Sequence, residues 1–285
     1  MTQDPRLPDF LIVGAMKSGT STLQVQLAAQ PGIFMTTPKE PNFFSDDPVY
    51  GQGLDWYRGL YAEAAPGDLK GEASTHYTKR PTHPHTIERM AAVLSAPRLI
   101  YVIRNPVDRA VSHYLHEWSQ GVMGRDALTA FDKHPELVDY GRYAMQIAPY
   151  IDRFGAGAVY LTSLEQLKSD PEGELTRIGA HIGARQPLVW NHDLGAQNVS
   201  AARVRRLPFH GLLVENPIAR TLRRTLVPKS IRTRIREARM RSDRPDLPPA
   251  LHRRLEAAFL QDRAALARLF PGHPALSACY PFAPA

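Results

Sequence analysis

Cysteine and long apolar runs are nearly absent from this sequence. Its 285 residues include one cysteine, Cys279, so no disulfide can form within the chain, and a secreted scaffold held by internal disulfides is excluded. No apolar run approaches the ~20 residues that cross a bilayer. The opening, MTQDPRLPDF, is polar and lacks the apolar core of a signal peptide. These features predict a cytoplasmic protein.

Basic residues, in contrast, are abundant and unevenly placed. The chain has a net charge of +7, but residues 203–241 alone hold twelve Arg or Lys against two Glu. That segment therefore carries +10 and the rest of the chain −3. A concentrated basic stretch predicts an anionic partner, such as a nucleotide, an anionic lipid, an acidic substrate or a nucleic acid.

Strand and helix patterns alternate along the chain. Continuous apolar runs predict buried strands at Phe10–Val13 and Leu99–Ile103, with a short one at Ala158–Leu161 and a weaker one at Leu69–Glu72. Helical spacing predicts helices over Ser21–Ala29, Val107–Trp118, 142–154, 171–183 and 249–269. Such alternation is typical of an α/β fold. We expect a three-layer α/β/α sandwich with a mainly parallel central sheet.

No linker forces a division of the chain, so we expect one domain over residues 1–285. Within it we expect a basic helical segment at about 200–248 and a C-terminal helix at about 249–270. Residues 216–241 are predicted to form one or two basic amphipathic helices. They fit either a solvated pair flanking a ligand site or a peripheral contact with an anionic membrane. Few aromatics are interleaved, so no nucleic-acid partner is expected.

A glycine-bounded turn, Gly14–Ser21, joins the first predicted strand to the first predicted helix. Backbone N–H groups at such a helix start can bind an anion, to which Lys17 adds a charge. An ordinary turn would use the glycines for geometry alone. The spacing resembles that of nucleoside triphosphatases, but Thr20 stands where they carry lysine, and the second strand ends in Arg104 rather than an acidic residue. The pattern favours an anion bound without a metal.

A second candidate anion site follows the second predicted strand. Arg104 stands at the end of that strand, and Ser112 lies about two turns into the next helix. Ligands of open α/β sheets bind at the carboxyl ends of strands, and a guanidinium can donate two hydrogen bonds to one phosphate. Taken alone, Arg104 is better explained as a surface ion pair and Ser112 as a tolerated helix serine.

Four motifs in order carry a resemblance to a known family. They are FLIVGAMKSGTSTL at 10–23, KEPNFF at 39–44, GEASTHY at 71–77 and YVIRNPVDRAVSHY at 101–114. Together they resemble the sulfotransferases that use 3′-phosphoadenosine 5′-phosphosulfate (PAPS), and in particular the branch of the heparan sulfate enzymes and their bacterial relatives. Weaker similarity continues through 198–207. The resemblance implies a P-loop-like loop that binds the phosphosulfate, and no metal.

The resemblance also implies which residues bind PAPS. The 5′-phosphosulfate would lie against Lys17, Ser18, Gly19, Thr20 and Ser21. The 3′-phosphate would be held by Arg104 and Ser112. Relatives often carry a Pro-Arg-Ser-Arg run in a lid over the nucleotide, where this chain has RVRR, so Arg205 or Arg206 is expected to cover it.

The expected chemistry needs a base and a cation. An acceptor hydroxyl is a poor nucleophile, so a base must take its proton. In the heparan branch that base is the glutamate of the KEPNFF motif, here Glu40, with His113, His116 and His76 as rivals. Lys17 would offset the charge that develops on the leaving phosphate oxygen.

Some residues depart from the family pattern or have two readings. Ala73 stands where several heparan enzymes have lysine, so Glu72 either binds substrate or braces its loop. His83 and His85 are expected in a surface turn rather than as a metal pair. The aromatic residues Trp56, Tyr57 and Tyr61 fit either the core or a platform for a sugar ring.

The sequence as a whole predicts transfer of a sulfuryl group from PAPS to a hydroxyl, with adenosine 3′,5′-bisphosphate as product. The acceptor would be a carbohydrate, a glycolipid or lipid, or a small metabolite. Two alternatives are a P-loop nucleotide-dependent kinase and a non-catalytic basic module that binds membranes or polyanions. The absence of the G-K-[ST] run counts against the kinase.

Overall fold

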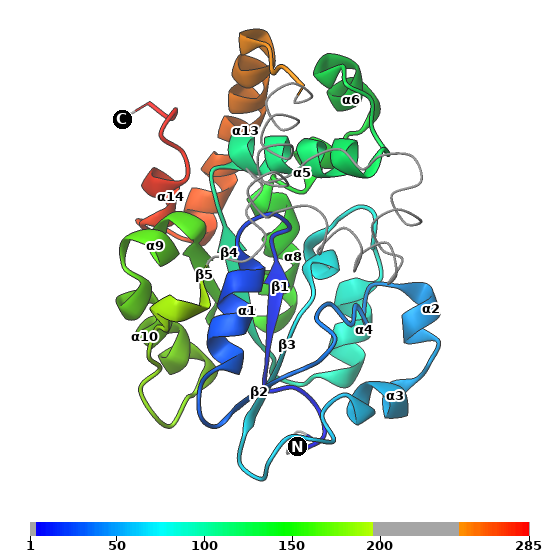
Figure 1. Cartoon of the computed structure of the whole chain (residues 1–285), viewed down its shortest axis with the longest axis vertical. Helices are drawn as coiled ribbons and strands as arrows, with labels where there is room; N and C mark the ends of the chain where they lie inside the picture. Colours follow the sequence, from blue (N-terminus) through cyan, green and yellow to red (C-terminus); the bar gives the residue numbers. More distant parts are fainter. Residues whose placement is uncertain (1–3, 196–244, 285) are drawn as a thin grey trace, which may run out of the picture.

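The core of the molecule is a sheet of parallel strands. The computed structural model describes residues 4–195 and 245–284 (Figure 1). Five strands pair in the order β2-β3-β1-β4-β5, and each pairing is parallel. Their bounds are β1 Phe10–Gly14, β2 Ile33–Met35, β3 Leu69–Ala73, β4 Arg98–Ile103 and β5 Val159–Ser163. Because they all run the same way, their carboxyl ends meet at one edge of the sheet.

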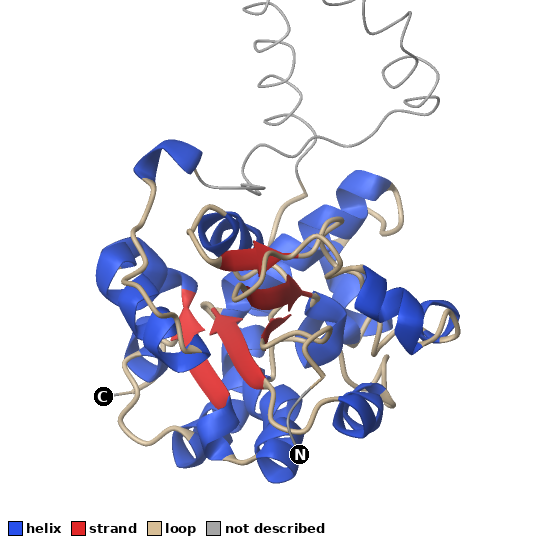
Figure 2. Ribbon diagram, turned by 90° about the horizontal axis from the view of Figure 1, so that it is seen from below, coloured by secondary structure: helices blue, strands red, loops and turns tan. Residues whose placement is uncertain are grey.

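Helices cover both faces of this sheet (Figure 2). One face packs against α1 Thr20–Ala28, α9 Leu164–Ser169 and α10 Pro171–Ile182. The other face packs against α4 Thr86–Val93, α5 Pro106–Gln120, α8 Tyr143–Phe154 and α13 Pro249–Leu269. The shorter segments are α2 Asp47–Tyr50, α3 Leu54–Gly59, η1 Thr75–Thr78, α6 Ala127–Lys133, α7 Glu136–Asp139, η2 Ala156–Ala158, η3 His192–Leu194 and α14 Ala275–Ala278.

Side chains of the central strand alternate between two hydrophobic layers. Phe10 and Ile12 pack with the α1 and α10 layer, whereas Leu11 and Val13 pack with the α5, α8 and α13 layer. All of them are fully buried, which explains why the strand is a continuous apolar run in the sequence. The predicted α/β/α sandwich is therefore confirmed, and every pairing of its sheet is parallel.

All the predicted strands, and the predicted helices within the described residues, are present, but the structure also holds elements that were not expected, among them α4, α9 and a strand. The strand at Ile33–Met35 was not expected, because three residues are too few to show a pattern. The weak strand prediction near residue 69 is confirmed as β3. The basic segment at 200–248, including the expected amphipathic helices at 216–241, lies outside the described residues except for its last four positions. Among residues 4–195 and 245–284, no helix is both long and apolar enough to span a membrane.

A close approach between β1 and β3 requires a glycine. Gly71 pairs with Phe10 in the parallel ladder, and a Cβ at Gly71 would lie 2.3 Å from Cζ of the Phe10 ring. That separation is impossible for a real side chain, so any larger residue must displace the buried ring. The glycine of the GEASTHY motif thus keeps β1 in place between its neighbours.

We expect Gly71→Ala to lower the free energy of unfolding by about 1–3 kcal/mol, because the added methyl group overpacks the sheet. The measurement is denaturant unfolding at equilibrium. Gly59→Ala is a matched control, since a Cβ at Gly59 meets nothing within 4 Å. Equal stability of the two variants would contradict this account of the β1–β3 packing.

Candidate functional site

The turn between β1 and α1 has features that suit an anion. Gly19, the N-cap of α1, has a left-handed backbone (φ 89°), and Lys17 is also left-handed (φ 70°). No side chain caps α1, and its first turn holds no acidic residue. Helix starts leave backbone N–H groups without intrahelical partners, and the helix dipole adds partial positive charge there. An anion at this turn would therefore meet N–H donors and the half-buried Lys17.

The predicted loop residues do not all face the same way. Ser18 is fully buried and Thr20 is 4% exposed, so their side chains are inside the protein. The buried Ser18 Oγ has no hydrogen-bond partner among the described residues. Lys17, Gly19 and Ser21 are partly exposed at the rim. The sequence could not distinguish these two sets, because the turn follows neither helical nor strand periodicity.

A hydrogen-bonded cluster joins this turn to the predicted base. Lys39 Nζ donates to Ser21 Oγ at 2.8 Å and lies 3.2 Å from Glu40 Oε1. Thr75 Oγ1 donates to both carboxylate oxygens of Glu40 at 3.3 Å. The backbone N–H of Glu40 donates to the carbonyl oxygen of Ala73 at 3.1 Å. The Glu40 carboxylate is thus held at the carboxyl edge of the sheet, one lysine away from the start of α1.

Arg104, at the end of the neighbouring strand β4, contacts the same turn. Its Nη1 donates to the carbonyl oxygen of Lys17 at 3.2 Å, and its Nη2 pairs with Asp108 at 3.2 Å. Among the described residues, its buried Nε has no hydrogen-bond partner. Ser112 is 5% exposed on α5, the helix that follows Arg104. The two predicted anion sites are therefore adjacent, connected by a direct hydrogen bond.

His113, a rival base, has several cations near it and one carboxylate, Glu117, whose Oε1 is 3.7 Å from its Nε2. Its ring stacks on Tyr140, with centroids 5.7 Å apart. Burial, followed by the charges of Arg109, Lys79 and Lys17, lowers the pKa of His113 to about 2. A neutral imidazole with so little affinity for a proton is a weak base, which disfavours His113 in that role.

Lys79 is a cation at the site that sequence reasoning missed. It follows η1 directly, and its Nζ lies 5.8 Å from the centroid of the Tyr140 ring. Burial lowers the pKa of Lys79, while the nearby carboxylates of Glu40, Asp46 and Glu117 oppose that shift. No motif marks this lysine. Only the fold shows that its charge is near Glu40.

His76 is the better placed of the histidine rivals. Its Nδ1 is 2.8 Å from Asp46 Oδ1, so the carboxylate can orient the ring. His116 is farther from a carboxylate, at 4.0 Å from Glu117. A carboxylate that fixes the tautomer of a histidine is a common arrangement for a general base. His76 therefore stays an alternative to Glu40.

The reading of Glu72 is settled by its burial. Glu72 is fully buried and accepts hydrogen bonds from Tyr57 (2.6 Å), Tyr77 (2.8 Å) and Ser74 (3.0 Å). Burial raises the pKa of the Glu72 carboxyl to about 7. It braces the interior beneath the site and does not reach a substrate. Tyr57 belongs to the core as well, stacked on Phe43 at 4.3 Å.

The remaining aromatic and cysteine candidates are also interior groups. Tyr61 is 4% exposed, and Trp56 packs against the same cluster. Cys279 is buried, and burial together with the charge of Glu165 raises the pKa of its thiol, so nothing activates it. Arg205 and Arg206, expected to cover the nucleotide, lie outside the described residues.

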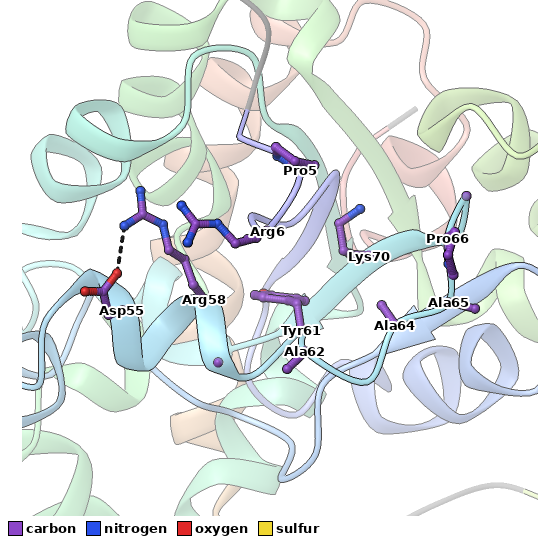
Figure 3. Close-up of a pocket in the computed structure, with 12 residues that line it drawn as sticks. Pro5, Arg6, Asp55, Arg58, Tyr61, Ala62, Ala64, Ala65, Pro66 and Lys70 are labelled. Atoms are coloured by element: carbon purple, nitrogen blue, oxygen red, sulfur yellow. Dashed lines mark hydrogen bonds and ion pairs between the residues drawn. The ribbon is translucent and has the colours of Figure 1, made fainter.

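A hollow of about 710 Å³ lies away from this site, near the amino ends of β1 and β3 (Figure 3). Three basic side chains line it, but each is paired with a carboxylate. The pairs are Arg6 with Asp4, Arg58 with Asp4 and Asp55, and Lys70 with Asp9. Paired cations offer little to an anion, and the hollow lies at the edge opposite the uncapped start of α1, so it is a weaker candidate than the carboxyl edge of the sheet.

Comparison with known proteins places this architecture in one family. The family model described as the sulfotransferase domain matches residues 7–204. Mouse (Mus musculus) heparan sulfate glucosamine 3-O-sulfotransferase 3B1 is 31% identical over 196 residues, which cover 66% of this chain and 49% of the relative. Cattle (Bos taurus) bifunctional heparan sulfate N-deacetylase/N-sulfotransferase 2 is 27% identical over 209 residues, covering 66% and 23%. The chain thus spans about half the length, or less, of these relatives.

Solved structures agree on the fold. A sulfotransferase from Alicyclobacillus acidocaldarius superposes with a TM-score of 0.63 at 24% identity, covering 92% of this chain and 95% of that one. The sulfotransferase domain of the curacin biosynthetic pathway gives 0.54 at 14% identity, covering 93% and 99%. At these identities the likeness concerns the fold.

The buried Glu72 predicts a pH dependence of stability. Its pKa in the folded state, about 7, is above the ordinary value of 4.5, so the folded protein holds this proton more tightly than the unfolded chain. The stabilisation is complete below about pH 4.5 and is lost as the pH rises through about 7, by an amount on the order of 3 kcal/mol. We expect Glu72→Gln to remove this part of the slope in denaturant unfolding measured from pH 5 to 8. An unchanged slope in that variant would show that Glu72 is not the group responsible.

Proposed function

Because the chain belongs to the sulfotransferase family, we propose that it transfers a sulfuryl group from PAPS to a hydroxyl of a carbohydrate. The observation that carries this proposal is the position of Glu40. Its carboxylate is linked through Lys39 to Ser21, at the start of the helix that would hold the donor. A base and an anion-binding turn at one edge are what proton removal and sulfuryl transfer need together.

The residues at the edge of the sheet fit the charges of PAPS. The uncapped start of α1 and Lys17 suit the 5′-phosphosulfate, with Ser18 and Thr20 contributing backbone N–H groups. Arg104 has a buried Nε without a described partner and suits the 3′-phosphate, with Ser112 on the following helix. The product would be adenosine 3′,5′-bisphosphate. No residue in this arrangement requires a metal.

In the proposed mechanism, Glu40 takes the proton of the acceptor hydroxyl while the hydroxyl oxygen of the acceptor attacks sulfur. The sulfur–oxygen bond to the phosphate breaks in line with this attack, and Lys17 offsets the negative charge that develops on the leaving oxygen. Lys39 and Thr75 hold the carboxylate in place. Lys39 and Lys79 also supply positive charge near the position where Ala73 replaces the lysine of related enzymes.

The acceptor we favour is a sugar chain of the heparan sulfate type. The mouse relative is named for O-sulfation of glucosamine in heparan sulfate, and the cattle relative for N-sulfation. The O-sulfating relative has the higher identity, 31% against 27%, which favours a hydroxyl acceptor. We also propose a cytoplasmic location. Lipid or small-metabolite acceptors are a further proposal, which a screen of acceptors would test. A membrane contact through residues 216–241 is another, which a lipid flotation assay would test.

The function can be tested with radiolabelled PAPS and oligosaccharides of the heparan sulfate type. We expect Glu40→Gln to lower kcat by about 10²–10⁴-fold, because proton transfer is lost, with little change in affinity for adenosine 3′,5′-bisphosphate. Glu88→Gln is a control, since that carboxylate is 85% exposed on α4. Wild-type turnover in Glu40→Gln would transfer the role of base to His76. Lack of transfer to any sugar by the unmodified protein would refute the acceptor class.

The donor assignment predicts a selective effect of Arg104. We expect Arg104→Ala to weaken binding of adenosine 3′,5′-bisphosphate by about 10–100-fold, the loss of a charge-assisted hydrogen bond, and to change binding of adenosine 5′-phosphate much less. Isothermal titration measures both. Arg6→Ala, at an exposed arginine of the opposite edge, is the matched control. Equal losses for the two nucleotides would show that Arg104 does not contact the 3′-phosphate.

A further inference from the structure

A second cluster of polar side chains lies beside the proposed base, and the mechanism with Glu40 as base does not use it. It consists of Asp46, His76 and His83, which come from three separate segments, and each of them is partly buried. His76 Nδ1 is 2.8 Å and His83 Nδ1 is 3.6 Å from the same oxygen, Asp46 Oδ1. The two imidazole rings are stacked, with centroids 4.7 Å apart and planes at 20°.

We propose that Asp46, His76 and His83 form a binding site for a divalent cation of the zinc class. Two imidazole nitrogens and one carboxylate oxygen are ligands that such ions prefer. With metal–ligand distances of ~2.0–2.1 Å, neighbouring ligand atoms lie about 3.4 Å apart in a tetrahedral site. The observed separations, 2.8 and 3.6 Å, lie on either side of that value, and all the candidate ligand atoms are within 4.8 Å of one another.

The surroundings of the cluster support this assignment. Ser45 Oγ donates to Asp46 Oδ1 at 2.9 Å, and the carbonyl oxygen of Ser45 lies 3.2 Å from His83 Nδ1. The contact from Ser45 Oγ orients the carboxylate. A cation on His83 Nδ1 would replace the hydrogen bond of that nitrogen to the Ser45 carbonyl, because one ring nitrogen cannot donate a proton and bind a metal at once. Binding requires both Nδ1 atoms to be free of protons, so uptake of the cation releases any proton they carry. Lys79 is a nearby positive charge that a bound cation would repel. The negative charge of Asp46 acts on both Lys79 and His83 and would offset part of that repulsion.

A cation at this site would act on the position of Glu40. His76 follows Thr75, whose hydroxyl contacts both carboxylate oxygens of Glu40, and Asp46 follows the KEPNFF segment closely. Three protein ligands leave at least one coordination position for water. The cation would thus fasten the turn that carries Thr75 to the segment that carries Glu40. Its role is to position the base.

His85 offers a matched control in the same turn. The sequence places His83 and His85 symmetrically around Pro84, but the structure separates their roles. His85 is 61% exposed and lies 4.0 Å from Glu88, away from the cluster. Removing its imidazole therefore changes the histidine content of the turn without changing the proposed site.

The test is titration of the full chain, stripped with a chelator, with Zn²⁺ alone in a calorimeter and with Co²⁺ followed by its d–d absorption. We expect the wild type to bind one equivalent and His83→Ala to bind at least about 100-fold more weakly, because a ligand is lost. Asp46→Asn, which keeps the side-chain shape, should weaken binding as well, and His85→Ala should match the wild type. Zn²⁺ should raise the Tm of the wild type and of His85→Ala, and leave the Tm of His83→Ala unchanged.

Two results would overturn the proposal. One is a wild-type protein that takes up no stoichiometric Zn²⁺ or Co²⁺. The other is tight binding that persists in both His83→Ala and Asp46→Asn, which would place the metal elsewhere in the chain. Circular dichroism of each variant establishes that it is folded. Because the readouts are binding and Tm, they do not depend on sulfuryl transfer or on which group is the base.

Discussion

The position of β1 between two parallel neighbours is the constraint on which the site depends. Its ladders with β3 and β4 bring three chain segments to one edge of the sheet: the turn after Gly14, the residues after Ala73 and Arg104. Hydrogen bonds then connect them, from Arg104 to the carbonyl of Lys17 and from Glu40 to the carbonyl of Ala73. A shift of one strand by one residue would exchange its inward and outward faces and separate these groups.

Basic side chains are paired with carboxylates at both edges of the sheet, but the carboxyl edge also holds a buried arginine that is not fully hydrogen-bonded within the described residues. At the amino edge every basic side chain of the hollow is paired with a carboxylate. At the carboxyl edge Arg109 is fully buried, its Nε and Nη1 have no described hydrogen-bond partner, and burial lowers its pKa to about 10. After burial, the charge of Arg109 is the largest cause of the lowered pKa of His113. Burying a guanidinium charge that is not fully hydrogen-bonded costs free energy, and an anion bound at this edge would offset part of that cost. This is a physical reason to expect the anion site at the carboxyl edge.

Several parts of this architecture follow from the sequence because their cause is local. The apolar runs of β1 and β4 are continuous since both faces are buried, and the turn at residues 14–21 has its own glycine signature. The three-residue β2 has no such pattern. Lys79 was missed for a different reason, because only the fold brings its charge near Glu40. The burial of Glu72 likewise depends on tyrosines that the sequence does not mark.

The segment that carries Glu40, the proposed base, combines an unfavourable backbone conformation with favourable burial. Glu40 and Asn42 both have left-handed backbones, with φ of 59° and 55°, a conformation that costs free energy for residues other than glycine. Phe43 and Phe44, directly after them, are at most 1% exposed, and Phe43 stacks on Tyr57. Burial of two phenylalanines contributes several kcal/mol, enough to offset the backbone cost. The core thus holds the segment in a conformation that places Glu40 at the carboxyl edge of the sheet, where its backbone N–H donates to the carbonyl oxygen of Ala73.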